Sequence, residues 1–364
     1  MRKFKNESGK MRNEEIILDL RRRIVSGEFS PGNALPRRHE LLASYLASNE
    51  TVQRAVNQLT QEGFINTRGS KGMFVSSNPP NLFRFGVVLP PNHREMETNG
   101  DTQWGALERA IEEISRERPE YSFSLYHIDL HCDPDLPEFR RLVEDLELGL
   151  IAGVIFSSSV DPQMLLRLKP FRVVLHSPAW KEVIPATVMR HDYRKLAQLA
   201  VARLLQRGAS RVAILLAART RETLVAELEP HVRESGVICR PEWVHGIHHL
   251  PEGVWEASRL IRLLCAPAQP VRPDGLIVLN ENLLPPVLAS LRECGIVPGR
   301  EIQIVSHCNT PATKPLASGI NYVAFNAKSI LLHSIDRLRQ PRPEAEGVEF
   351  IPPEYVTFGT PAWN

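Results

Sequence analysis

Cysteine is scarce in this chain of 364 residues, and no two cysteines stand at the C-x-x-C spacing. The chain has five: Cys132, Cys239, Cys265, Cys294 and Cys308. Zinc sites and small disulfide frameworks both need cysteines at short, regular spacings. The sequence therefore predicts no metal site, no other cofactor and no disulfide-stabilised fold, and it suits a reducing compartment.

Long apolar runs are also missing. No stretch approaches the roughly 20 apolar residues of a membrane-spanning helix. The N-terminus is charged but lacks the apolar core of a signal peptide. We therefore expect a cytoplasmic protein without a membrane partner.

The motifs that mark common enzyme classes are absent as well. The chain has no G-x-S-x-G elbow, no P-loop and no G-x-G-x-x-G after a strand. The histidine-rich run HGIHHL over 245–250 spans a predicted strand-to-helix junction, which favours a solvated loop over a metal site. We expect a protein that is not an enzyme; substrate turnover that is lost on replacing Asp192 or Glu281 would argue otherwise.

Charge is distributed unevenly, although the net charge is only +2. Residues 1–80 hold 13 Lys and Arg against 8 Asp and Glu, and the remainder holds 31 against 34. A basic head on a slightly acidic body is typical of a nucleic-acid-binding module joined to a domain that does not touch nucleic acid. The open alternative is a basic tail that only aids solubility.

Residues 35–75 carry the strongest pattern in the chain. Pro36 is expected in the first turn of a helix, because a backbone N–H there would have no hydrogen-bond acceptor within the helix. An apolar stripe at helical spacing follows, made of Leu41, Leu42, Tyr45 and Leu46. Ser48 or Asn49 can then cap a second helix, whose inward face is Val52, Ala55, Val56 and Leu59. The two helices predict a helix-turn-helix.

A basic hairpin is predicted directly after the second helix. The run FINTRGSKGMFV over 64–75 has two strand-like segments around a Gly-Ser-Lys-Gly turn. Its basic tip could cradle a phosphate, but the hairpin context favours the wing of a winged helix-turn-helix. The residues expected to contact DNA are Arg37, Arg38, His39, Ser48, Asn49, Thr51, Gln53, Arg54, Arg68 and Lys71.

The head, together with a preceding helix that ends near Ser26-Gly27, resembles the GntR family of bacterial repressors. The family pattern combines I-x-x-G-x-x-x-P-G-x-x-LP, S-x-x-T-V-x-x-A-x-x-x-L-x-x-E-G and a G-x-x-V wing. Seventeen positions match in order: Ile24, Gly27, Pro31, Gly32, Leu35, Pro36, Glu40, Leu41, Ser48, Thr51, Val52, Ala55, Leu59, Glu62, Gly63, Gly72 and Val75. The resemblance implies a sequence-specific DNA-binding domain.

Three positions depart from the family. His39, Asn49 and Gln53 stand where members often have arginines that reach phosphates and guanines. Arginine pairs with guanine through two hydrogen bonds, whereas Asn and Gln suit adenine. We expect weaker phosphate anchoring and more tolerance of A·T pairs, or else a head that no longer reads sequence.

Beyond a turn-forming linker over 77–83, buried-strand patterns alternate with amphipathic helices. Strands are predicted to begin at Phe85, Phe123, Gly153, Arg172, Val212, Gly275 and Ile302, and helices over 104–118, 138–147, 192–206, 222–235, 253–265 and 283–294. This alternation predicts parallel strands covered on both faces, and there are too many for one sheet. The fold class is α/β: a winged helix-turn-helix plus a two-lobed, doubly wound body.

The body resembles the effector domain of LacI/GalR repressors, which has a periplasmic-binding-protein-like fold. Residues 187–216 look like its V-x-x-D strand, long helix and following strand, and residues 273–305 like its P-D-A-I-x-x-x-N-D to I-x-V-V run. A GntR-type head on a LacI-type body is the architecture of arabinose-responsive, AraR-like regulators. The resemblance implies that a small molecule, such as a sugar, binds in a cleft.

Eight residues are candidate ligand contacts: Trp104, His176, Trp180, Asp192, Arg221, Asn280, Glu281 and His307. Asn280 and Glu281 stand at the family's Asn-Asp pair, and His307 lies where the family has a G-[FY]-D-[DN] turn. The Asp of that turn is absent, and the family's arginine position aligns with Leu224 rather than with Arg221. Packing for the tryptophans, helix capping for Asp192 and loss of ligand binding altogether remain alternatives.

These patterns together predict a bacterial transcriptional regulator, a repressor, that binds a near-palindromic operator as a homodimer. We expect a disordered tail over 1–10, a DNA-binding domain over 11–76, the linker over 77–83 and a ligand-sensing and dimerisation domain over 84–364. The alternative is a ligand-sensing or protein-interaction module with a degenerate head. A ligand can regulate the protein only if it binds one arrangement of the dimer more tightly than the other.

Overall fold

The computed structural model describes residues 13–94, 103–129, 135–158, 160–176, 186–218, 221–248, 252–312, 317, 319–340 and 347–356. The tail predicted over residues 1–10 lies outside these ranges. The chain divides into two compact units. The first unit comprises Met1–Pro91, Ile114–Met189 and Leu332–Glu349, and the second comprises Asn92–Glu113, Arg190–Leu331 and Phe350–Asn364.

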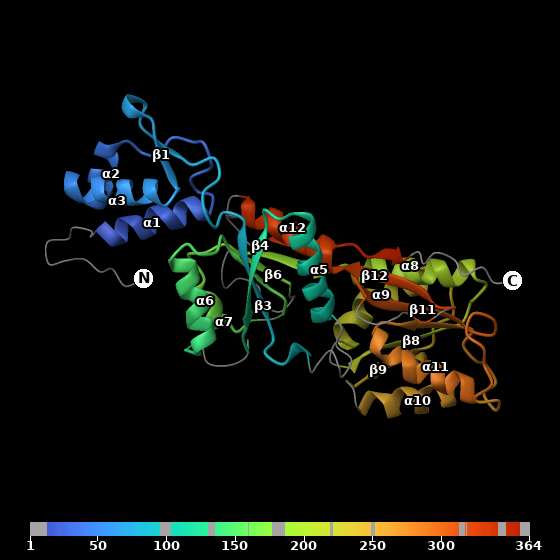
Figure 1. The fold of residues 1–364 in the computed structure, drawn as a ribbon. Coiled ribbons are helices and arrows are strands. Elements are labelled where there is room, and N and C mark those ends of the chain that lie inside the picture. The colour runs from blue at the N-terminus through green and yellow to red at the C-terminus, as the bar shows by residue number, and fades with distance from the viewer. Residues whose placement is uncertain are drawn as a thin grey trace. The chain divides into compact units, whose positions relative to one another are not determined.

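The head of the first unit is built from helices and a small hairpin (Figure 1). Over residues 13–75 its elements are α1 (Asn13–Val25), α2 (Arg38–Tyr45), α3 (Asn49–Gln61), β1 (Ile65–Thr67), the 3-10 turn η1 (Gly69–Lys71) and β2 (Met73–Val75). The strands pair antiparallel, with Ile65 opposite Val75. The apolar faces of the helices form a buried core that includes Ile16, Leu20, Ile24, Leu41, Val52 and Leu59. The predicted winged helix-turn-helix is confirmed.

The ends of the head helices follow local chemistry, with one difference from the prediction. α1 ends at Val25, and Gly27 then adopts a φ of +76°, a conformation that glycine tolerates best. The Ser48 hydroxyl accepts a hydrogen bond from the backbone N–H of Thr51 at 3.2 Å and caps α3. The expected place of Pro36 inside α2 is wrong: α2 begins at Arg38, because Glu40 reaches back to the backbone N–H of Arg37 at 2.5 Å.

The described residues of the body form two six-stranded sheets. The first has the order β4-β3-β5-β6-β7-β13. Its strands are β3 (Arg84–Leu89), β4 (Ser122–His127), β5 (Val154–Phe156), β6 (Val173–Leu175), β7 (Thr187–His191) and β13 (Gly347–Ile351). One face packs against α6 (Pro137–Glu147) and α7 (Pro162–Arg167) in a cluster that includes Phe139, Leu142, Met164 and Leu165.

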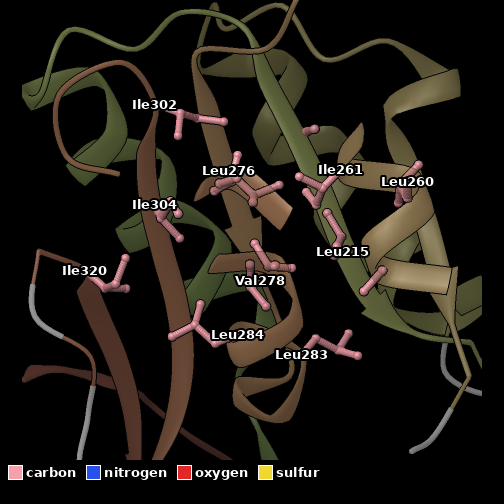
Figure 2. Packing of buried hydrophobic residues seen from close by; sticks show 14 of the residues in the cluster. Leu215, Leu260, Ile261, Leu276, Val278, Leu283, Leu284, Ile302, Ile304 and Ile320 are labelled. Carbon is pink, nitrogen blue, oxygen red and sulfur yellow. The ribbon is translucent and has the colours of Figure 1, made fainter. Parts of the chain in front are cut away.

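The second sheet has the order β9-β8-β10-β11-β12-β14. Its strands are β8 (Val212–Ala217), β9 (Val244–Ile247), β10 (Gly275–Val278), β11 (Gln303–Thr310), β12 (Asn321–Asn326) and β14 (Glu354–Val356). One face packs against α10 (Glu252–Leu264) and α11 (Leu284–Glu293), and the other against α8 (Tyr193–Gln206) and α9 (Arg221–Glu234). Figure 2 shows Ile261 of α10 and Leu284 of α11 packed near Leu276 and Val278 of β10.

The two sheets share one strand order, which confirms the prediction of two similar lobes. In the first sheet, β3 lies between the edge strand β4 and β5. In the second sheet, β8 lies in the same way between the edge strand β9 and β10. The pairs β3–β5 and β8–β10 are parallel, and so are the edge pairs β3–β4 and β8–β9. Ligands of such sheets bind outside the carboxyl ends of the strands, where the order reverses. In the second sheet that point lies between β8 and β10.

All seven predicted strands and all six predicted body helices are present. Two helices and five strands of the described body were not expected from the buried-run pattern: α7, α12 (Ala327–Arg339), β7, β9, β12, β13 and β14. β12 reads NYVAFN, and its polar ends interrupt the apolar run that marked the other strands. The remaining described elements are the helix α5 (Gln103–Glu117) and the 3-10 turns η3 (Pro241–Trp243) and η4 (Glu281–Leu283).

Asp274 ties the start of β10 to the turn before β8. Its Oδ1 accepts hydrogen bonds from the backbone N–H groups of Ser210 at 2.8 Å and Arg211 at 2.7 Å, and its Oδ2 accepts one from Arg211 Nε at 2.9 Å. Burial opposes ionisation, but the hydrogen bonds from Arg211 and Ser210 prevail and lower the pKa of this carboxyl. The charged form is therefore the one that the fold stabilises.

We expect Asp274→Ala to destabilise the second unit by about 1–3 kcal/mol, because it leaves two backbone N–H donors without a hydrogen-bond acceptor. The stabilisation is present above the carboxyl's unfolded pKa and is lost as the pH falls through the lowered folded value. Thermal unfolding at neutral pH measures it. Asp135→Ala is the matched control: its 3.0 Å pair with Arg167 is largely exposed, and its loss should change little. Equal melting temperatures for the two variants would contradict the assignment.

Candidate nucleic-acid interface and effector site

α3 presents one polar face because its other face is fixed in the core. Val52, Ala55, Val56 and Leu59 are buried, which turns the predicted DNA contacts of this helix outward. Ser48, Asn49 and Arg54 are exposed, and Thr51 and Gln53 are half-buried. The start of α3 also directs backbone N–H groups outward, which favours a phosphate there.

A chain of hydrogen bonds crosses from α2 to the exposed face of α3. The Arg38 guanidinium donates to Gln53 Oε1, and Gln53 Nε2 donates to Asn57 Oδ1 at 2.6 Å. Arg54 pairs with Glu50 one turn earlier on the same helix. Asn57 was not among the predicted contacts, although its spacing of four residues from Gln53 could have indicated it. The polar face of α3 is thus an ordered amide and guanidinium surface.

The wing adds a second basic element. The Arg68 guanidinium lies 4.8 Å from the centroid of the Phe74 ring, and Lys71 is exposed. Gly72, with a φ of +103°, allows the tight turn between them and β2. Arg37, Arg38 and His39 are all exposed at the start of α2. The predicted DNA contacts therefore lie on the surface of one small domain.

In the second unit, the residues after β10 and at the end of β11 form one polar group. Glu281 Oε1 accepts hydrogen bonds from Asn309, from the backbone N–H at 3.3 Å and from Nδ2 at 3.0 Å. Asn280 caps η4: its Oδ1 accepts from the backbone N–H of Asn282 at 3.1 Å. Residues 306–309, which align with the family's G-[FY]-D-[DN] turn, belong to strand β11 here, and the Asn309 amide pairs with the longer acid of this chain.

Two histidines of the second unit, each half-buried, lie around one aromatic ring. His191 stacks on Phe325 with ring centroids 4.1 Å apart, and His307 lies 5.5 Å from the same ring. Burial lowers the pKa of His191 to about 4. Burial, with a smaller contribution from His191, lowers the pKa of His307 to about 3. Both imidazoles are therefore neutral at physiological pH, and sequence reasoning had identified only His307.

Four buried polar atoms of the second unit have no hydrogen-bond partner among the described residues: Trp104 Nε1, Arg203 Nε, His307 Nε2 and Thr310 Oγ1. The last two lie on β11. α5, which carries Trp104, is anchored beside the same strand ends, because Arg109 Nη1 donates to Ala312 O at 2.9 Å. An unsatisfied buried donor or acceptor costs free energy, so this arrangement suits a polar ligand that supplies the partners.

The remaining candidate ligand contacts are not joined to the group formed by Glu281 and Asn309 by any contact described here. The Asp192 carboxylate caps α8 by accepting from the backbone N–H of Lys195 at 2.9 Å. His176 belongs to the first unit, where its Nε2 is 2.7 Å from Ser334 Oγ. Arg221 begins α9, and Trp180 lies outside the described residues.

The histidine-rich run over 245–250 is engaged in local contacts. His245 Nε2 lies 2.7 Å from Glu242 O, and His248 Nδ1 lies 2.6 Å from Glu256 Oε1. Across the described ranges, no three His, Cys, Asp or Glu side chains are grouped as metal ligands would be. Within the same ranges, no helix has the length and apolar character needed to cross a membrane.

Two domain families match the chain. Residues 12–75 match the bacterial regulatory proteins of the gntR family, and residues 201–357 match the periplasmic binding protein-like domain. The chain therefore combines a GntR-type helix-turn-helix head with a periplasmic-binding-protein-like body, as the sequence predicted.

Curated relatives match a short part of the chain. The chain is 34% identical over 65 residues to the HTH-type transcriptional repressor YtrA of Bacillus subtilis, covering 18% of this chain and 50% of that protein. It is 38% identical over 60 residues to the transcriptional regulator TreR of the same organism, covering 16% of this chain and 25% of TreR. This chain thus spans half or less of the length of these relatives.

Solved structures share the fold of the body. A regulatory protein of the LacI family from Chloroflexus aggregans superposes with a TM-score of 0.55 at 17% identity, covering 76% of this chain and 97% of that one. A LacI family regulator from Enterococcus faecium with bound ribose gives 0.53 at 15% identity, covering 75% of this chain and 97% of the other. The body has the fold of LacI-family effector domains.

Proposed function

We propose that this protein is a bacterial DNA-binding transcriptional regulator, a repressor that acts in the cytoplasm. The observation that carries the proposal is the polar face of α3 with the basic wing beside it, on a head of the GntR type. α3 enters the major groove of a near-palindromic operator, and a homodimer presents two heads to its half-sites.

Each predicted DNA contact has a role in this proposal. Ser48 and Thr51 bind a phosphate at the N-terminus of α3, and Asn49 and Gln53 read base edges. Arg37, Arg38, His39, Arg54, Arg68 and Lys71 contact the DNA backbone. On binding, Gln53 exchanges its contacts with Arg38 and Asn57 for contacts to a base.

The effector is a neutral, hydroxyl-rich small molecule such as a sugar. The second unit offers uncharged polar atoms, His307 Nε2 and Thr310 Oγ1 on β11 and Trp104 Nε1 on α5, and the carboxylate of Glu281, which is bound by Asn309 of β11. Aromatic rings suit the apolar faces of sugar rings, and these polar atoms suit hydroxyls. Ribose bound to the Enterococcus faecium regulator of the same fold supports this class.

The test of DNA binding is selection of duplex DNA from a random pool by the full-length protein. We expect a motif of two related half-sites with A·T-rich positions. Failure to enrich any motif, from protein that unfolds cooperatively, would overturn sequence-specific binding. It would favour the second candidate function, a ligand-sensing or interaction module, which is motivated by Gln53 and Arg54 being engaged within the head.

The effector site predicts opposite effects on affinity and stability. Trp104→Phe and Thr310→Val each remove an unsatisfied polar atom and keep most of the shape. Without ligand, we expect each variant to be as stable as the natural protein or more stable, by up to about 1–3 kcal/mol. Affinity for the effector sugar, found by screening sugars calorimetrically, should fall about tenfold. Leu166→Ala, at an exposed position of the first unit, is the control. Unchanged affinity in both variants would exclude these atoms from the site.

A further inference from the structure

A cavity lies in the second unit, lined by none of the residues of the proposed effector site. It has a volume of about 330 Å³ and opens between α9, β8 and the start of β9. Ile214 and Val244, which line it, each lie three residues before the ends of β8 and β9 at Ala217 and Ile247. Three residues of a strand span about 10 Å, so this part of the cavity wall lies about 10 Å along the strands from their carboxyl ends. The volume is at the lower end of the range for small-molecule sites.

The cavity wall is mostly aliphatic. Val225, Leu228 and Val232 of α9 lie at helical spacing on one face of that helix and meet Ile214 and Val244 of the sheet. Valine and leucine side chains offer nothing to a hydroxyl-rich molecule, which would lose its hydrogen bonds to water there. The wall therefore selects a hydrocarbon group rather than a sugar.

Two arginines give the cavity a charge. Among the lining residues that the structure describes, Arg233 and Arg240 are charged, and none is Asp or Glu. The Arg240 guanidinium lies 5.1 Å from the centroid of the Trp243 ring, which is buried. Its nearest carboxylate contact, Glu242 Oε1, is 3.7 Å away, longer than a hydrogen bond. The planar guanidinium thus retains donors that can pair with a carboxylate through two hydrogen bonds.

We propose that this cavity binds a compact apolar carboxylate, a medium-chain or aromatic monocarboxylic acid. The hydrocarbon part lies against the valines and leucine, and the carboxylate pairs with Arg233 and Arg240. The site is separate from the sugar site, and its occupation does not depend on the proposed regulatory function.

Cys239 makes the proposal testable, because it lines the cavity and is a half-buried cysteine outside any disulfide. Cys294 is also outside any disulfide but exposed, and it does not line the cavity. The experiment measures alkylation of each cysteine in the full-length protein by peptide mass spectrometry, with octanoate or octan-1-ol added. We expect octanoate to slow alkylation of Cys239 about tenfold or more and to leave Cys294 unchanged. Octan-1-ol should need about tenfold higher concentrations for the same effect.

The variant Arg233→Gln with Arg240→Gln tests the carboxylate contact. It should raise the half-protecting octanoate concentration about tenfold and leave that of octan-1-ol unchanged. Cys265 and Cys308 are buried, so their continued resistance to alkylation shows that the variant is folded. Equal protection by octanoate and octan-1-ol would overturn the carboxylate specificity. Protection of neither cysteine, or of both, would overturn the site.

Discussion

Replacing Arg68 and Lys71 together by alanine should weaken operator binding about 10- to 100-fold at roughly 0.1 M salt. Both side chains extend from the wing of the head, where Lys71 is exposed and Arg68 lies over Phe74. Each phosphate that a cation neutralises releases counterions, so the loss of two contacts should reduce the slope of log affinity against log salt by about 2. Fluorescence anisotropy with the selected operator at several salt concentrations measures both quantities.

The matched control removes the same charge elsewhere. Lys169 and Arg207 are exposed basic residues of the body, and alanine at both positions should leave affinity and salt slope nearly unchanged. The wing variant should also lose affinity for random DNA by the same factor, because phosphate contacts carry no sequence information. A loss of discrimination without a change in salt slope would instead mean that the wing reads bases.

The head could be predicted in detail because its determinants are local. Gly27, Pro31, Gly32, Gly63 and Gly72 mark turns, and each glycine among them adopts a positive φ in the structure. The apolar positions of α3 repeat at helical spacing, so the outward face followed directly. The one error, the place of Pro36, arose because Glu40 caps the helix from inside, which position in the sequence alone did not reveal.

The effector site could be predicted only in part because its contacts join distant segments. Glu281 and Asn309 belong to different strand ends, and His191 meets Phe325 from another element altogether. No local periodicity relates such residues, so His191, Asn309, Thr310 and Phe325 were missed. The candidate residues that were proposed from the sequence and lie in this region, such as Glu281 and His307, came from resemblance to a family pattern rather than from local chemistry.

Acidification should destabilise the second unit strongly, because desolvation holds His191 and His307 as neutral imidazoles in the folded protein. Their folded pKa values of about 4 and about 3 lie below the value near 6.5 expected in the unfolded chain. Between these limits the unfolded chain binds more protons than the folded one, so stability falls as the pH falls below about 6.5. At pH ~5 each histidine should cost about 2 kcal/mol relative to neutral pH, or about 4 kcal/mol for the pair.

The double variant His191→Gln with His307→Gln separates this cause from the titration of carboxylates. Glutamine stays neutral over this range, so the variant's melting temperature should decline less than that of the natural protein between pH 7.5 and 5. A difference of about 4 kcal/mol corresponds to roughly 8–16 °C for a unit of this size. At pH 7.5 the variant should be the less stable protein, since it loses the ring stacked on Phe325 at 4.1 Å.

The curves of the natural protein and the double variant should therefore converge, or cross, as the pH falls. His248→Gln is the control, because its side chain is 69% exposed and its removal leaves His191 and His307 intact. Parallel curves for the natural protein and the double variant would show that the two histidines are already solvated in the folded state. Convergence would establish that the two histidines are held neutral beside Phe325. A neutral His307 can donate a hydrogen bond to an uncharged effector or accept one from it.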